Sequence, residues 1–470
     1  MSKAIKVSVI GAGSATFSLG LVKDICLTES LSGSQISFMD VDTERLEMIH
    51  KLATRYASEL GADLRFESTV DRRASLRDAD FVINTASVVP YGAGLASAEA
   101  ARKHGYYFSS APNAGQYGYY NITFMMDVAR DMEEVCPDAW LIQSGNPVFE
   151  GCTLMTRETS LKVCGLCHGH YGYRKICNMI GIDPDRVTWQ APGLNHDIWL
   201  THFSYEGRNA YPLIDEWIAT KGEEYWRSNV ATLPVPEGSA STPELARAWD
   251  IDLSRAAVHM YRMFGLMPIG DTPWNRVVGW WYHDNLQAKK YWYGEPWGGQ
   301  YTEESWTMYI KNLERHVARI AGLAQDPKAS LIGALGSTST HEQQVPIIDG
   351  LVNNVEGQFQ VNVPNHGALE GVPDNVVVEV PAIVNQKGIQ PVHVGSLPPK
   401  IMLEQILPTW LRMERDLLAI KTGDRSILLW NVLDSHQTRS YEQAIAVLED
   451  MLGMEFNQQM NEHFKWPVNW

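Results

Sequence analysis

IKVSVI at residues 5–10, followed by GAGSATF at residues 11–17, decides the fold of this chain. The first six residues are almost continuously apolar, as expected for a central strand that is buried on both faces of a parallel sheet. Gly11 permits a tight turn after this strand, and Gly13 lets backbone amides approach a pyrophosphate at the start of the next helix. We therefore expect Gly11, Gly13 and Ser14 to bind a dinucleotide; the alternative is a tight turn without a ligand.

The segments that follow alternate between strands and helices. Further strands are predicted at residues 35–40 (QISFMD), 80–86 (DFVINTA), 139–145 (AWLIQSG) and 162–167 (KVCGLC). A periodic helix follows the second strand, and another is predicted at about 121–135. This order predicts an α/β fold with a Rossmann-like, doubly wound parallel sheet of the kind found in lactate and malate dehydrogenases, over residues 1–185.

The pattern changes after residue 185. We expect antiparallel strands in the segment that closes at Glu206-Gly207, a loop at 222–245 and a strand at 376–384. Helices are expected at about 246–264, 303–325, 398–420 and 438–452. This half is predicted to be a C-terminal α+β domain, residues 186–470, which packs over the carboxyl ends of the first sheet and carries substrate, metal and subunit contacts.

Charge and cysteine usage narrow the possible partners. Lys plus Arg is 39 and Asp plus Glu is 55, so the net charge is 39 − 55 = −16, which argues against nucleic acid and anionic membrane surfaces. The start, MSKAIKVSVIGAG, has no apolar signal region, and we find no run of about 18 apolar residues. Six scattered cysteines suit a reducing compartment. We expect a cytoplasmic enzyme.

Asp40 and Thr85 complete the expected nucleotide site. Asp40 ends the second strand, where a carboxylate can accept both ribose hydroxyls and would repel a 2′-phosphate, which favours NAD over NADP. The alternative is that Asp40 or Asp42 caps the next helix. Thr85 and Asn84 end a later strand and are expected to border the adenosine half of the dinucleotide.

Cys167 and His196 are the candidate metal ligands. Each follows an apolar stretch that is predicted to be a buried strand, in CGLCHGHYG at 164–172 and GLNHD at 193–197. A thiolate and an imidazole at neighbouring strand ends can hold one divalent metal. With only two protein ligands, oxygens of a sugar would complete the coordination. The alternatives are a buried apolar cysteine and a hydrogen-bonded structural histidine.

Three further residues are candidates for substrate chemistry. Asn146 directly follows a strand, where its amide can bind a sugar hydroxyl or cap the next helix. Asp271 and Tyr261 are candidate bases, or structural residues. The tryptophans near residues 274–297 can stack on sugars, although such residues more often pack cores.

Seven short motifs occur in one order: GAGS, the MDVD strand end, Asn146-Pro147, CHGH at 167–170, GLNH at 193–196, PIGDT at 268–272 and NVPN at 362–365. Over essentially its whole length, the chain resembles the family 4 glycoside hydrolases, which are NAD- and metal-dependent. The resemblance implies Mn²⁺ ligands Cys167 and His196, substrate contacts Asn146, His168 and Asn195, a general acid His168, and a base Asp271 with Tyr261 in reserve.

The CHGH tetrapeptide is similar to the CHGx form of the α-glucuronidase branch. The resemblance implies hydrolysis of α-glucuronides of short oligosaccharides, by transient oxidation of carbon 3 with NAD⁺, metal-assisted elimination, water addition and re-reduction. It also implies a homodimer or homotetramer. The alternatives are an α-galacturonidase or a neutral α-glucosidase or α-galactosidase of the same family, and, from another class, an NAD-dependent 2-hydroxy acid dehydrogenase. Arg276 is one candidate partner for a substrate carboxylate.

Overall fold

The core of the molecule is a parallel sheet with strand order β3-β2-β1-β4-β5-β6. The computed structural model describes residues 4–14, 17–107, 110–228, 252–274, 279–299, 302–340 and 342–468. The strands are β1 Lys6–Ile10, β2 Gln35–Met39, β3 Arg65–Thr69, β4 Phe81–Asn84, β5 Trp140–Gln143 and β6 Lys162–Gly165. The strand order reverses between β1 and β4, which is where sheets of this kind bind ligands beside the carboxyl ends of their strands.

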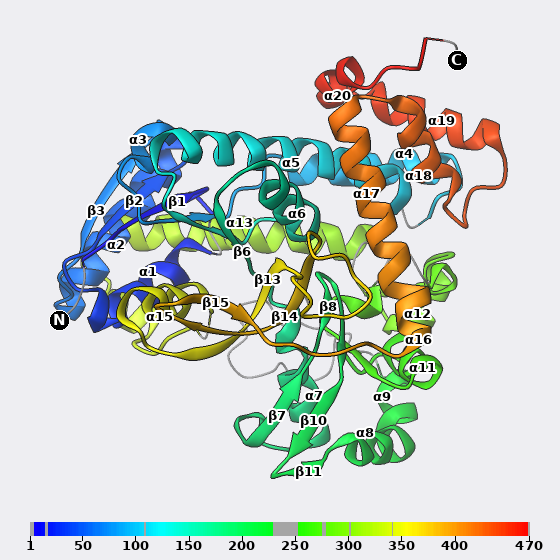
Figure 1. Ribbon diagram of the computed structural model, residues 1–470, viewed down its shortest axis with the longest axis horizontal. Helices are drawn as coiled ribbons and strands as arrows, with labels where there is room; N and C mark the ends of the chain where they lie inside the picture. The colour runs from blue at the N-terminus through cyan, green and yellow to red at the C-terminus, as the bar shows by residue number, and fades with distance from the viewer. Residues whose placement is uncertain are drawn as a thin grey trace.

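Helices cover both faces of this sheet (Figure 1). Val9 of β1 packs in one apolar cluster with α1 and α2, whereas Ile10 packs in another with α5 and α6. The helices are α1 Ser18–Leu27, α2 Thr43–Leu60, α3 Arg72–Leu76, α5 Ser110–Val135 and α6 Val148–Glu158. Because successive side chains of a strand point to opposite faces, the apolar run at residues 5–10 is buried on both sides. The predicted doubly wound sheet is confirmed.

Strands from the second half of the chain continue the same sheet. Asn362 of β13 pairs with Gly165 of β6 in antiparallel orientation, and the order then runs β13-β14-β8-β9-β12, with β15 beside β14. These strands are β8 Gly193–Leu194, β9 Asp197–Leu200, β12 Met267–Ile269, β13 Gly357–Pro364, β14 Val377–Asn385 and β15 Gly388–Pro391. The second half of the chain therefore adds strands to the edge of the first sheet. It also contributes helices and loops that surround the sheet. The division at residue 185 stays a prediction.

A smaller antiparallel sheet forms the lower lobe in Figure 1. Its order is β11-β10-β7, as expected for the segment that closes at Glu206-Gly207. The lobe comprises β7 Val187–Gln190, β10 His202–Tyr205, β11 Arg208–Asn209, α7 Gly172–Ile180, α8 Tyr211–Trp217, α9 Glu223–Arg227 and α11 Arg255–Phe264. The expected loop at 222–245 is thus helical at its start, and its residues from 229 onward lie outside the described ranges.

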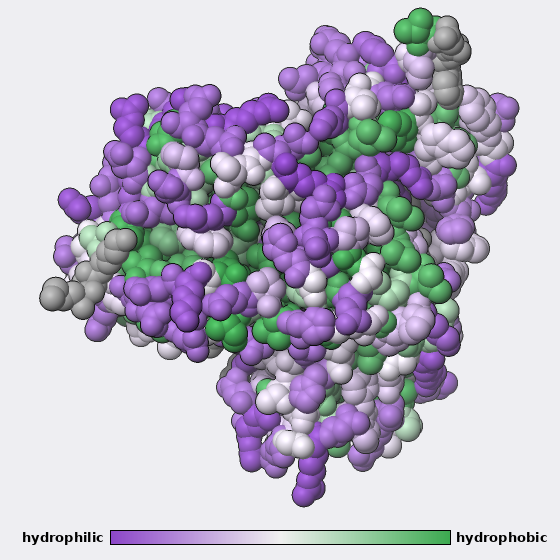
Figure 2. Space-filling model, viewed as in Figure 1, coloured by the Kyte–Doolittle hydropathy of each residue, from purple (hydrophilic) through white to green (hydrophobic). Residues whose placement is uncertain are grey.

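The remaining helices flank the sheet. They include α4 Tyr91–Lys103, α12 Leu286–Tyr293, α13 Glu303–Gln325, α14 Leu331–Leu335, α15 Gln344–Asn353, α17 Leu407–Thr422, α18 Arg425–Leu433, α19 Tyr441–Leu452 and α20 Gln458–His463. The helices predicted at 303–325, 398–420 and 438–452 are confirmed. Figure 2 shows hydrophobic patches over α17 and also across the middle of this face, between hydrophilic areas, and Leu411 of α17 is half exposed. In the described part of the chain, no helix has both the length and the apolar character to cross a membrane.

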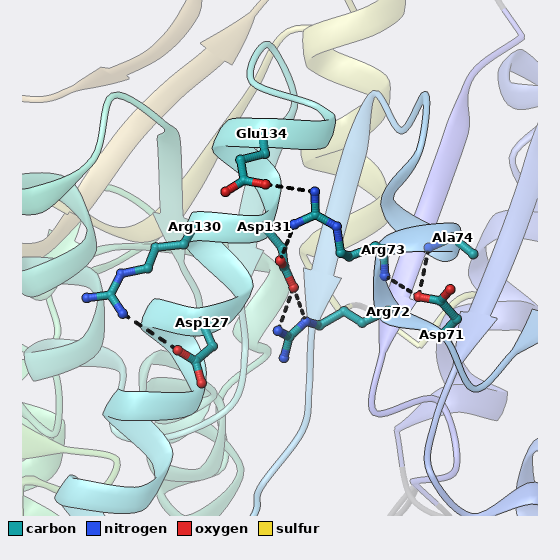
Figure 3. A network of polar contacts seen from close by, with 8 residues as sticks. All are labelled: Asp71, Arg72, Arg73, Ala74, Asp127, Arg130, Asp131 and Glu134. Atoms are coloured by element: carbon teal, nitrogen blue, oxygen red, sulfur yellow. Dashed lines mark hydrogen bonds and ion pairs between the residues drawn. The ribbon is translucent and has the colours of Figure 1, made fainter.

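An ion-pair network holds α3 against the end of α5 (Figure 3). Asp131 accepts hydrogen bonds from Arg72 at 2.6 Å and from Arg73 at 2.7 Å, and Arg73 also reaches Glu134 at 2.8 Å. Burial raises the pKa of Asp131, but the hydrogen bonds from the two arginines outweigh this and lower it. Charge-assisted bonds of this kind are stronger than neutral ones, so the network fixes α3 on its face of the sheet.

Candidate active site

The predicted dinucleotide turn lies at the carboxyl end of β1. Gly11 has φ +83°, and a Cβ there would lie 2.7 Å from Cα of Ala86, so only glycine fits. The amide of Gly13 donates to Oδ2 of Asp40 at 2.7 Å. The Ser14 amide donates to the Gly11 carbonyl at 3.1 Å, which closes the turn before α1. Thr16 lies outside the described residues.

The hydrogen bonds show which of Asp40 and Asp42 caps the helix that follows β2. Asp42 is the N-cap of α2, since its side chain accepts from the Arg45 amide. Asp40 instead binds the glycine turn, which leaves its carboxylate at the carboxyl end of β2, where a ribose is expected. Thr85 donates to the carbonyls of Ile10 and Gly11 at 3.1 and 3.2 Å, so it supports the same turn from β4.

Two glycines bring the loops with the other candidate residues together. A Cβ on Gly270 would lie 2.4 Å from Cα of Gly169, and Gly270 has φ +61°. A Cβ on Gly169 would meet Ile198 at 3.6 Å, so the missing side chain at 169 faces β9 and Gly270. The close contact places the loop of Cys167 and His168 directly against the loop of Asp271.

His196 lies in the two-residue turn between β8 and β9, beside Asp271. Its φ is +64°, a conformation that is uncommon for a residue with a side chain and that clusters at functional sites. Its Nε2 is 3.3 Å from Oδ2 of Asp271, and the two side chains are 39% and 41% exposed. An open imidazole and carboxylate in contact can bind a cation or share a proton.

His168 forms a second ion pair, with a residue that the sequence analysis did not single out. Its Nε2 is 3.0 Å from Oε2 of Glu342. Desolvation by the surrounding protein lowers the pKa of His168, but the hydrogen bond that it donates to Glu342 and the charges of Glu342, Cys167 and Asp271 raise it to about 9. Burial raises the pKa of Glu342, and the His168 contact more than reverses this. The contact with Glu342 therefore favours the protonated form of His168.

A buried carboxylate stands behind the His196 turn. Glu379 of β14 is 1% exposed, and it accepts a hydrogen bond from the Asn195 amide at 2.9 Å. Burial raises its pKa, and the nearby His196 charge is among the groups that oppose this. Asn195 is itself buried, so the structure places it behind the turn. The single glutamate in the otherwise apolar strand VVVEVPAIV is the sequence feature that could have identified Glu379.

Asn146 and Tyr261 have different surroundings. Oδ1 of Asn146 is buried and has no hydrogen-bond partner in the described part of the chain, as expected for an atom that awaits a ligand. The Tyr261 hydroxyl donates to Asp215 of α8 at 3.0 Å, so it is engaged within the lower lobe. Arg276 lies outside the described residues.

The tryptophan-rich segment mainly packs a core. Trp274 is buried and stacks on Tyr293 with ring centroids 4.0 Å apart. The ammonium of Lys289 lies 4.7 Å from the Trp274 ring. Among the described tryptophans of this segment, only Trp280 is substantially exposed, at 41%. Packing is thus favoured over a sugar platform for Trp274.

The donor types of Cys167 and His196 suit a divalent metal. Cys167 is the one partly exposed cysteine of the six, since the others are buried, and a sulfur and an imidazole nitrogen are ligands of borderline-soft divalent ions. Within the described ranges, no group of three or more His, Cys, Asp or Glu side chains has metal-binding geometry. The donor set therefore leaves room for substrate oxygens.

Comparison with known sequence families identifies the family to which this chain belongs. The profile "Family 4 glycosyl hydrolase" matches residues 6–182, and "Family 4 glycosyl hydrolase C-terminal domain" matches residues 191–437. The chain belongs to the family 4 glycosyl hydrolases. It is therefore a glycosidase, and the resemblance seen in its motifs is confirmed.

Characterised relatives of this family 4 glycosidase differ in their substrates. It is 25% identical to an alpha-galactosidase of Bacillus subtilis, with 84% of this chain and 85% of the relative covered. It is 26% identical to an alpha-glucosidase of Erwinia rhapontici, with 95% and 97% covered. It is 24% identical to an alpha-galacturonidase of Thermoanaerobacter italicus, with 84% and 83% covered.

Solved structures share the fold. A putative glucosidase, lplD, from Bacillus subtilis has a TM-score of 0.78 at 21% identity, with 96% of this chain and 100% of that chain covered. A 6-phospho-alpha-glucosidase from gut microorganisms, in complex with NAD and Mn²⁺, has a TM-score of 0.77 at 16% identity, with 97% and 99% covered. Lactate dehydrogenase from Eimeria maxima reaches 0.51 at 14% identity, with 90% and 97% covered. The expected dehydrogenase-like sheet is confirmed.

Proposed function

We propose that this family 4 glycosidase hydrolyses α-glucuronides of short oligosaccharides with NAD⁺ and a divalent metal, most simply Mn²⁺. One observation carries the proposal: the contact of Gly169 with Gly270 gathers Cys167, His168 and Asp271, and Asp271 touches His196. When bound, NAD⁺ accepts and returns a hydride at carbon 3, and the metal acts as a Lewis acid on the neighbouring oxygens. A related fold binds NAD and Mn²⁺, which supports both assignments.

The glycine turn would hold the dinucleotide. Gly11, Gly13 and Ser14 lie between the end of β1 and the start of α1, where backbone amides and the helix dipole favour a pyrophosphate. Asp40 keeps its carboxylate at this turn through the Gly13 amide, and it would repel the additional phosphate of NADP. Thr85 supports the turn from the β4 side.

Cys167 and His196 would hold the metal, and Asp271 and His168 would move the protons. Asp271 removes the proton from carbon 2, which becomes acidic once carbon 3 is a ketone. His168 protonates the oxygen of the leaving group, and Glu342 orients its ring. Asn146 binds a sugar hydroxyl through its unpartnered Oδ1. Tyr261 stays in reserve as a base, because Asp215 already engages its hydroxyl.

The choice of a glucuronide rests on the CHGH tetrapeptide at 167–170 and its likeness to the α-glucuronidase branch. Similarity to alpha-galacturonidases makes a galacturonide the second candidate. Similarity to an alpha-glucosidase and an alpha-galactosidase keeps neutral hexosides as the third. A 2-hydroxy acid dehydrogenase would form one NADH for each substrate oxidised. Membership of a glycosidase family argues against this alternative.

A panel of p-nitrophenyl α-glycosides tests the proposal. Glucuronide, galacturonide, glucoside, galactoside and 6-phosphoglucoside are each assayed with and without NAD⁺, Mn²⁺ and a thiol reductant. We expect the fastest hydrolysis with the glucuronide, dependence on all three additions, and no net NADH. Faster turnover of another glycoside would overturn the substrate assignment, and full activity without NAD⁺ or metal would overturn the mechanism.

A further inference from the structure

We infer that a cavity beside the His168–Glu342 ion pair receives the leaving group of the substrate, and that this leaving group is an uncharged sugar. The cavity has a volume of about 650 Å³, which is within the usual range for small-molecule sites. Glu342, Tyr171, Trp189, Gln358 and Gln360 are among the residues that line it. The inference rests on the proposed role of His168 as general acid.

His168 borders the cavity through two of the residues that line it. Its Nε2 contacts Glu342 at 3.0 Å, and its ring lies 6.2 Å from that of Tyr171. Glu342 and Tyr171 both line the cavity.

This arrangement follows from the chemistry of a glycosidic bond. The group that protonates the leaving oxygen has to stand where the two sugars meet. The sugar that is oxidised then lies toward Asp271 and His196, so the departing sugar extends past His168. The cavity shares Glu342 with the expected acid, and we therefore assign this space to the departing sugar.

The walls of the cavity suit a sugar ring. Trp189 is half-buried and is held by stacking on Tyr173, with centroids 4.6 Å apart at 21°. A fixed indole gives the apolar face of a pyranose a surface to pack on. Gln360 is 3% exposed, and its Oε1 has no hydrogen-bond partner among the described residues. An unpartnered amide oxygen can accept from a sugar hydroxyl.

The charges around the cavity favour a neutral ligand. Each charged side chain in the described lining is engaged: Glu342 by His168, Asp24 by Thr340, and Arg174 by Asp185. A phosphate or carboxylate on the leaving sugar would therefore meet no unpaired cation among the described lining side chains, and it would face the carboxylates of Asp24 and Glu342. A neutral hexose or pentose fits this lining best.

Two variants test the cavity. Trp189→Ala removes the indole, and Gln358→Trp adds bulk from an exposed lining position. Gln325→Trp, on the exposed end of α13, makes the same exchange away from the cavity and is the matched control. The substrates are the methyl α-glycoside of whichever sugar the panel identifies and the disaccharide in which that sugar is α-linked to a neutral hexose. We expect kcat/KM for the disaccharide to fall about tenfold in both variants, and kcat/KM for the methyl glycoside to stay within about twofold.

Equal losses on both substrates, or no loss on the disaccharide, would overturn the inference. If no glycoside is turned over, the proposed function is wrong, but the cavity can still be tested separately. Calorimetric titration with xylobiose and cellobiose then measures whether the cavity binds neutral sugars. Binding by the wild type and by Gln325→Trp that is lost in Gln358→Trp supports it. Absent binding in the wild type, or binding retained in Gln358→Trp, rules it out.

Discussion

At the scale of single residues, short sequence motifs contain most of the candidate site residues whose loops lie close together in the structure. Gly11, Gly13 and Asp40 could be predicted because a turn after a buried strand demands them locally. Asp271 is a candidate base from its motif alone, and the family resemblance favours it over Tyr261. Glu342 could not be predicted, because its partner His168 is remote in sequence and the surrounding residues, THEQQ, carry no pattern.

Replacing the candidate thiolate ligand tests the metal site directly. Cys167→Ser should weaken Mn²⁺ binding by about 100-fold or more, because a hydroxyl is a far poorer ligand than a thiolate for this ion. Titration followed by the electron paramagnetic resonance of free Mn²⁺ gives the affinity without any assay of activity. The matched variant is Cys136→Ser, a buried thiol at the end of α5. Unchanged Mn²⁺ affinity in Cys167→Ser would refute the ligand assignment.

Gly270 should be irreplaceable for geometric reasons. A methyl group there would lie 2.4 Å from Cα of Gly169, so Gly270→Ala should push apart the loops of His168 and Asp271. We expect about a 100-fold loss of kcat/KM and about 1–3 kcal/mol of destabilisation. Gly207→Ala is the control, since Gly207 has a similar φ of +78° with no atom within 4 Å of the added carbon. Equal activity of the two variants would contradict this account.

At the scale of elements, hydrophobic periodicity predicted most helices and strands. It placed the helix before β5 at about 121–135, whereas α5 begins at Ser110, because Gly and aromatic residues at 115–120 give no clear apolar repeat. A loop was also predicted to begin at residue 222, whereas α9 occupies Glu223–Arg227. Polar, solvated helices lack the apolar stripe on which such predictions depend.

The α3–α5 network has a pH dependence with a definite sign. Since the folded-state pKa of Asp131 is lowered, its stabilisation is present above the unfolded-state value of about 3.9 and is lost as the pH falls through the folded-state pKa. Asp131→Asn should lower the free energy of unfolding by about 1–2 kcal/mol at pH 7. Urea titrations of both proteins should show this difference shrinking below about pH 4. A difference that is constant with pH would contradict the assignment.

At the scale of the whole molecule, the parallel sheet and the C-terminal half could be predicted from the sequence. The extension of that sheet by strands of the C-terminal half could not. Pairing between Asn362 and Gly165 joins segments that are distant in the chain, and no local pattern records such a partner. The apolar cluster around α1 and α2 likewise includes Val361 and Val380 from the second half. The two halves therefore share one core.

Separating the halves tests the predicted boundary at residue 185. A fragment of residues 1–185 would expose the edge of β6 that β13 covers, and an open strand edge promotes association. We expect the fragment to aggregate or to unfold without a cooperative transition, as followed by sedimentation and circular dichroism. A monomeric fragment that unfolds cooperatively would establish residues 1–185 as an independent domain.

The central claim is that this glycosidase breaks its bond by elimination after a temporary oxidation, with Asp271 taking the proton from carbon 2. The most direct measurement uses the preferred α-glycoside deuterated at carbon 2, hydrolysed in ordinary water with NAD⁺ and Mn²⁺, and analyses the released sugar by mass spectrometry. The account predicts that the label is lost to the solvent. A product that retains the whole label at carbon 2 would contradict it.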